Sequence, residues 1–131
     1  MAIVPVVRGL YVCERVESDP DTKNLSLVNC FRGLRLADMP SIPEPFCVFA
    51  LLANGLGELT LRTTINPTDG GPDIYRYTAR VRLTDRMIEL RFKLTVECQF
   101  PGPGSYDICL FADDELIALT PILVTRLEDF R

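Results

Sequence analysis

The sequence predicts an all-β protein, a single-domain antiparallel β-sandwich of about eight strands that is immunoglobulin-like or related. Three observations support this fold class. Residues 57–65, 75–83 and 89–97 alternate apolar and polar side chains, which places one set on each face of an extended strand. Turn signals recur at intervals of roughly 8–12 residues, and no segment has the pattern of a helix.

Length and composition indicate one globular domain. The chain has 131 residues, which suits a single domain over residues 1–131 that buries about two thirds of its unfolded surface. Hydrophobic residues make up 47% and charged residues 24%, the balance of a folded protein. The net charge is −4 at pH 7, so the overall field does not favour nucleic acid.

Several features predict a cytoplasmic protein that does not enter a membrane. Residues 1–8 lack the basic start and long apolar run of a signal peptide. No segment approaches the roughly 18 apolar residues of a membrane span. The cysteines are odd in number and form no C-x-x-C motif, which favours reduced thiols that act as small apolar residues. These cysteines are Cys13, Cys30, Cys47, Cys98 and Cys109.

The first half of the chain predicts two strands and a crossover. Residues 6–16 form the first strand, and the turn-rich residues 17–24 connect it to the second. The second strand covers residues 25–36, with a bulge or bend at Gly33. Residues 38–45 contain three prolines that lack amide donors, so they form an extended crossover between the halves of the fold.

The second half supplies the remaining strands. Residues 46–53 are continuously apolar, which predicts a strand covered on both sides or one at an interface. The three alternating segments follow and are expected to form one antiparallel sheet with a single face in water. Residues 105–112 and 115–125 form a hairpin around residues 113–114, and Pro121 predicts a bulge or an edge in its second strand.

Segments along nearly the whole chain resemble a known family. They are residues 10–15, 23–31, 40–49, 55–58 and 103–114. On these segments the chain is similar to a group of small bacterial proteins that share a domain of unknown function. The shared motifs are strand and turn residues, so the resemblance implies a compact β-sandwich and bacterial origin. It supplies no catalytic or ligand-binding residue to transfer.

The absence of histidine argues against catalysis. It removes the commonest general base and the commonest zinc co-ligand together. A serine or cysteine nucleophile would need an adjacent base, and only Lys23, Lys93 or a carboxylate could serve. We therefore expect no enzymatic activity and no cofactor.

A dense set of basic side chains is the first candidate binding site. Alternation places all of them on the polar side of the three central strands, and the arginine fork suits carboxylate or phosphate groups. The set comprises Arg62, Arg76, Arg80, Arg82, Arg91 and Lys93. Tyr75, Tyr77 and Phe92 fall on the apolar side, so the base-stacking platform of a nucleic-acid groove is missing.

Two interpretations of the basic set remain open. It can be a solvated face whose arginines pair with Glu58, Glu89 and Glu97 across strands. Alternatively, it recognises an anionic partner. The second interpretation makes the protein a non-catalytic interaction or accessory module that binds a partner protein.

Acidic loops give the alternative function, a calcium or small-ligand binding β-sandwich. Alternate connections between antiparallel strands emerge at one end, where clustered carboxylates would suit a hard cation. The candidate residues are Asp19, Asp21, Asp85, Asp113 and Asp114. Solvated turns are the other explanation, because aspartate is an ordinary turn former.

Two apolar runs, residues 46–53 and 117–124, carry more consecutive apolar residues than one buried face requires. Full burial between the sheets and a covering loop explains them. Otherwise part of this surface is an interface with a partner or with a second copy, as in a homodimer.

Overall fold

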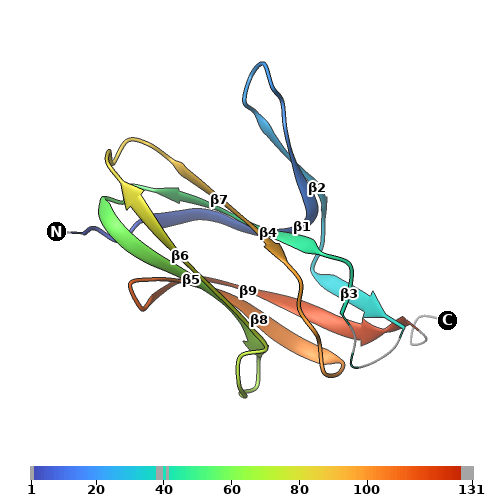
Figure 1. Cartoon of the computed structure of the whole chain (residues 1–131). Helices are drawn as coiled ribbons and strands as arrows, with labels where there is room; N and C mark the ends of the chain where they lie inside the picture. The colour runs from blue at the N-terminus through green and yellow to red at the C-terminus, as the bar shows by residue number, and fades with distance from the viewer. Residues whose placement is uncertain (1, 38–39, 41, 128–131) are drawn as a thin grey trace.

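The computed structural model describes residues 2–37, 40 and 42–127, which form nine β-strands in two sheets (Figure 1). The strands are β1 (Val6–Ser18), β2 (Leu25–Cys30), β3 (Gly33–Leu36), β4 (Phe46–Ala53), β5 (Gly57–Pro67), β6 (Tyr75–Leu83), β7 (Leu90–Val96), β8 (Gly104–Ala112) and β9 (Glu115–Arg126). One sheet has the strand order β2-β1-β4-β7, and the other has the order β3-β9-β8-β5-β6. The all-β prediction is confirmed. In this described part, no helix is long and apolar enough to cross a membrane.

The predicted strand over residues 25–36 is in fact two strands in different sheets. It breaks after Cys30, so that β2 pairs with β1 while β3 pairs with β9 in the other sheet. The β3–β9 pair is parallel, unlike the other pairs of strands. Gly33 therefore begins a new strand instead of bending an old one. The chain then returns from β3 to β4 in the first sheet, as the predicted crossover at residues 38–45 requires, although residues 38–39 and 41 lie outside the described residues.

The three alternating segments do not form one sheet, and this prediction was wrong. β5 and β6 pair in register from Gly57↔Leu83 to Ile65↔Tyr75. β7 instead pairs with β4, on the edge of the other sheet. Alternation correctly separates the two sides of each strand, but it carries no information about which strands are neighbours.

The β8–β9 hairpin around residues 113–114 is confirmed. Asp113 and Asp114 have φ angles of 47° and 68°, the left-handed pair that a two-residue type I′ turn requires. The edge predicted at Pro121 is also present, because β3 pairs with β9 only from Leu123 onward. The bulge lies elsewhere in this hairpin, where the register shifts between Leu110 and Phe111.

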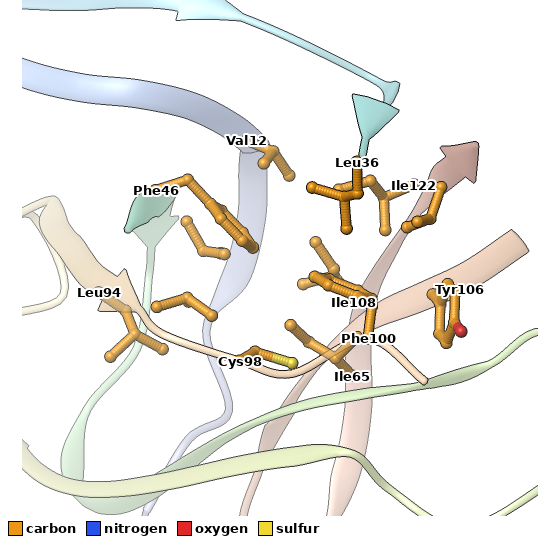
Figure 2. Close-up of a cluster of buried hydrophobic side chains, with 13 residues drawn as sticks. Val12, Leu36, Phe46, Ile65, Leu94, Cys98, Phe100, Tyr106, Ile108 and Ile122 are labelled. Carbon is orange, nitrogen blue, oxygen red and sulfur yellow. The ribbon is translucent and has the colours of Figure 1, made fainter. Parts of the chain in front are cut away.

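The two sheets pack against each other through one main cluster of buried side chains (Figure 2). Val12 and Phe46 come from the four-stranded sheet, and Ile65 and Ile108 come from the five-stranded sheet. Phe100, which is fully buried, contributes an aromatic ring to the same cluster. Because both sheets supply the cluster, the arrangement is sandwich-like.

β4 is covered on both sides, as its continuous apolar run predicts. Phe46 and Val48 point into the core, whereas Cys47 and Phe49 point outward and are still only 7% and 3% exposed. Residues 117–124 behave differently. Ile122 and Val124 are buried in the core, but their outward neighbours remain open to water.

Candidate functional site

The outward side of the five-stranded sheet, here called the open face, is built from laterally paired residues. Arg76 on β6 pairs with Thr64 on β5. Thr64 pairs in turn with Cys109 on β8, beside Leu119 on β9. Directly paired residues point to the same side of a sheet, so these four side chains form a row across the open face.

The β6 edge of the open face carries three exposed arginines. Arg76, Arg80 and Arg82 occupy alternate, even-numbered positions that all point outward. The Arg76 guanidinium lies 3.0 Å from Asp73, and that of Arg80 lies 3.7 Å from Glu58. The Arg76 and Arg80 side chains are 64% and 80% exposed, and ion pairs this open contribute at most about 1 kcal/mol. Both arginines can therefore exchange these partners for carboxylates of another molecule.

Arg62 lies on the open face but is engaged within the protein. Its guanidinium pairs with Asp114 at 2.6 Å and lies 4.2 Å from the ring centroid of Phe111. The side chain is only 26% exposed, and its Nε atom is buried with no hydrogen-bond partner among the described residues. Arg62 thus fixes the β8–β9 turn against the sheet and is a structural part of the face.

Arg91 and Lys93 lie on the opposite side of the molecule. They sit on β7, where they pair with Leu51 and Phe49 of β4 in the four-stranded sheet. Arg91 donates a hydrogen bond from Nη1 to the Lys23 carbonyl oxygen at 2.8 Å. The six basic residues predicted as one site therefore divide four to two between the sheets, because β7 joins β4 and not β6.

An apolar stripe on β9 completes the open face. Leu116, Leu119 and Leu123 are 49%, 49% and 52% exposed, although large apolar side chains are usually buried. β9 lies three strand spacings from β6, which separates the stripe from the arginines by about 14 Å. Sequence parity alone did not single out these leucines, since they belong to a run in which both sides of the strand are apolar.

The acidic loops do not assemble the predicted cation site. Asp19 accepts hydrogen bonds from the backbone N–H groups of Thr22 and Asp21, which hold the pKa of its carboxyl below the usual value. Asp85 and Asp113 likewise accept bonds from backbone amides. Across the described ranges, no three histidine, cysteine, aspartate or glutamate side chains gather in a metal-binding arrangement. These carboxylates form turns, which is the other explanation the sequence left open.

Comparison with known families agrees with the resemblance predicted from sequence. The model of a family of unknown function, DUF6941, matches residues 9–125. The chain belongs to this family. A search of curated proteins finds no match. The matched region runs from β1 into β9, so the family relationship concerns the two-sheet fold just described.

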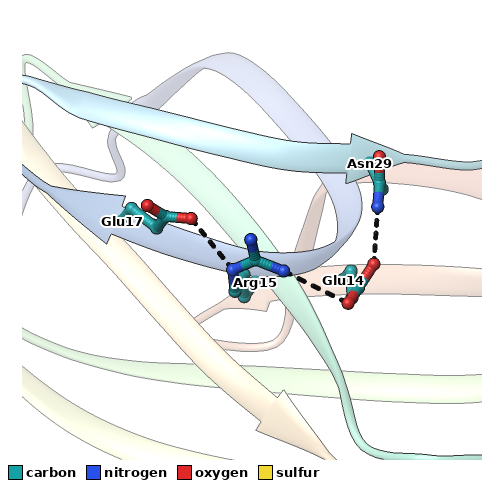
Figure 3. A network of polar contacts seen from close by, with 4 residues as sticks. All are labelled: Glu14, Arg15, Glu17 and Asn29. Atoms are coloured by element: carbon teal, nitrogen blue, oxygen red, sulfur yellow. Dashed lines mark hydrogen bonds and ion pairs between the residues drawn. The ribbon is translucent and has the colours of Figure 1, made fainter.

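Polar side chains at the base of the β1–β2 hairpin form a network that sequence reasoning missed (Figure 3). Arg15 lies between Glu17 and Glu14, at 2.9 and 3.2 Å. Asn29 on β2 donates a 2.6 Å hydrogen bond to the second carboxylate oxygen of Glu14. The network joins the two strands, and only their register could have revealed it.

The strand register also brings three of the cysteines of this family member next to one another. All five are free thiols, and four are buried as predicted, whereas Cys30 is exposed. Cys13 on β1 pairs with Cys30 on β2 and with Cys47 on β4. Burial, followed by the nearby Cys47 and Cys30 thiols, raises the pKa of Cys13 from 9.0 to about 11. Burial alone raises the pKa of Cys98 to about 11.

Proposed function

We propose that the protein is a non-catalytic interaction or accessory module whose open face binds a partner protein. The observation that carries this proposal is the presence, on one side of the same sheet, of three exposed arginines and a half-exposed stripe of leucines about 14 Å away. Exposed apolar patches with a polar rim commonly mark protein contacts. The partner is expected to carry a row of carboxylates beside an apolar ridge.

A protein partner fits this surface better than nucleic acid does. The chain as a whole has a net charge of −4, which repels a phosphate backbone at long range. The exposed apolar stripe of the open face consists of leucines, which cannot stack on bases as aromatic rings do, and the Phe111 ring is already occupied by the Arg62 guanidinium. Carboxylates on a folded partner need only local pairing with the arginine forks.

The two halves of the surface are expected to act differently. Leucines at the centre of a contact contribute to its lifetime by excluding water, whereas exposed charges at its rim mainly speed association. Raising the salt concentration should therefore slow binding without abolishing a contact centred on Leu119 and Leu123.

The proposal is tested by affinity capture from the native cell lysate at low and high salt. The double reversal Arg80→Glu/Arg82→Glu should abolish capture of the specific partner, because it adds repulsion from the partner's carboxylates, whereas salt only screens the attraction. The melting temperature should stay nearly unchanged, because both side chains are exposed. Lys93→Glu is the matched control, since Lys93 is also exposed on a strand but lies on the other sheet. Equal capture by the double reversal and the wild type would reject the proposal.

A second variant separates a different partner from a second copy of this chain. Leu119→Lys places a charge in the apolar stripe, and it should weaken capture that survives high salt. Light scattering at several concentrations identifies self-association directly. A wild-type dimer that Leu119→Lys converts to a monomer would replace the proposed partner with a second copy.

We further propose that the sandwich is immunoglobulin-like or related, and that it works in the bacterial cytoplasm. The Tyr106 hydroxyl donates a 2.6 Å hydrogen bond to the Gly102 carbonyl, a few residues upstream, as in the tyrosine corner of immunoglobulin-like domains. Five free thiols are consistent with a reducing compartment. Fractionation of the native cells tests the second point, and recovery of the protein outside the cytoplasmic fraction would contradict it.

A further inference from the structure

Three cysteines form a row across the outward side of the four-stranded sheet. Cys13 lies on β1, between Cys30 on β2 and Cys47 on β4, and it is directly paired with both. Directly paired residues project to the same side of a sheet. The three thiols are therefore neighbours, although 33 positions separate the first from the last (47 − 13 = 34, less one).

The hydrogen-bond pattern distinguishes the two pairs. The Phe31 amide donates to the Val12 carbonyl at 3.0 Å, which makes Cys13 and Cys30 a non-hydrogen-bonded pair of the antiparallel ladder. In such a pair the Cα atoms are about 4.5 Å apart and the side chains are at their closest. This separation lies within the roughly 4.4–6.8 Å range of disulfides. Cys13 and Cys47 then form a hydrogen-bonded pair, whose side chains are farther apart.

The two thiols of the closer pair differ in access. Cys30 is exposed, so a small molecule can reach it. Cys13 is completely buried. The raised pKa of Cys13 keeps its thiol protonated at neutral pH, so Cys13 does not react first.

We propose that Cys30 and Cys13 form an oxidant-sensitive disulfide site, in which a hydroperoxide oxidises Cys30 and Cys13 completes the bond. The Cys30 thiolate attacks the peroxide, the O–O bond breaks, and Cys30 becomes a sulfenic acid while the alkoxide leaves and takes up a proton. The Cys13 sulfur then attacks the Cys30 sulfur, and hydroxide leaves with the Cys13 proton as water. The two thiols together lose two electrons, and the O–O bond of the peroxide accepts them, so the products are a disulfide, an alcohol and water.

The bond would join β1 and β2 at the base of their hairpin. It would enclose 16 residues, positions 14–29, including the turn whose Lys23 carbonyl is held by Arg91. Closing this loop restricts the unfolded chain, so the oxidised protein should melt at a higher temperature than the reduced protein. The site adds a chemical switch on the sheet that the proposed partner does not use.

The test treats the reduced full chain with hydrogen peroxide and measures free thiols, intact mass and cross-linked peptides. Two of the five thiols should disappear, with a peptide linking Cys13 to Cys30, and dithiothreitol should restore both. Cys30→Ala should abolish the cross-link. Cys47→Ala should retain it, and it serves as the matched control within the same row.

Three results would overturn the proposal. They are a peptide linking Cys13 to Cys47, an unchanged loss of two thiols in Cys30→Ala, and wild-type Cys30 that ends as sulfinic acid with no cross-link. Because Cys30 is exposed, its alanine variant should fold normally, and the test does not depend on replacing the buried Cys13.

Discussion

Apolar side chains on the outward sides of the two sheets differ in their exposure to water, although both sheets follow the same alternation. On the four-stranded sheet, Phe49 is 3% exposed and lies beside Leu25 and Leu27 of β2 and Arg91 of β7, and Cys13 is fully buried. On the five-stranded sheet, Leu119 and Leu123 remain half exposed. The chain thus covers Phe49 and Cys13 on one sheet, whereas it leaves Leu119 and Leu123 on the other sheet partly open to water.

The largest expected effect on stability comes from comparing Phe49→Ala with Leu119→Ala. Phe49→Ala should lower the free energy of unfolding by about 3–5 kcal/mol, because it opens a cavity in a closed layer. Leu119→Ala should cost less than about 1 kcal/mol, since its side chain already contacts water. Urea denaturation measures both. Similar losses for the two variants would contradict the contrast.

A second test uses the buried thiols. The folded pKa of Cys13, about 11, lies above its unfolded value, so the folded chain keeps a proton that the unfolded chain loses above pH 9. Stability should therefore be intact below pH 9 and fall toward pH 11, with a Cys13 share on the order of 1–2 kcal/mol. Cys13→Ala should flatten this fall.

Cys109→Ala is the matched variant on the open face. Burial raises the pKa of Cys109 as well, while a hydrogen bond with Thr64 opposes the shift. Removing Cys109 should therefore flatten the alkaline fall less than removing Cys13 does. Thermal melts at pH 8–11 make the comparison, and an equal effect would show that the two faces screen their thiols alike.

The smallest expected effect concerns the hairpin over the four-stranded sheet. Arg91→Ala removes the hydrogen bond to the Lys23 carbonyl and should cost about 1 kcal/mol or less. Amide exchange should accelerate in residues 18–27 and hardly elsewhere, because the contact holds only the hairpin tip. Lys93→Ala, on the same strand, should leave this exchange unchanged. Uniform acceleration over the chain would refute a local role.

The alternation of apolar and polar residues correctly predicted which side chains of each strand face the core and which face water. Leu59, Leu61 and Ile65 are buried, whereas Arg80 and Arg82 point to water, as alternation requires. It could not assign neighbours, because alternation is a property of one strand. The basic set was split for this reason. Residues 117–124 were singled out as a possible interface, but alternation could not select Leu119 and Leu123 among them, because both sides of that strand are apolar.

The cysteine row shows why register resists prediction. A bulge between Val7 and Gly9 shifts the pairing of β1 with β4 by one residue. The unshifted register of Val7↔Leu52 would place Cys13 opposite Phe46, because the paired numbers sum to 59 (7 + 52 and 13 + 46). A single local irregularity therefore decides which side chain faces Cys13, and no spacing rule in the sequence contains it.

The parallel pairing of β3 with β9 limits when the five-stranded sheet can finish folding during synthesis. Gly33 pairs with Leu123, which lies 90 positions later (123 − 33). A ribosome that adds 5–20 residues per second would need roughly 5–20 s to make that interval. During synthesis β3 is therefore made well before β9, the strand beside it in the described part of the chain, and cannot pair with it until β9 follows. The five-stranded sheet closes only when the last strand has left the ribosome.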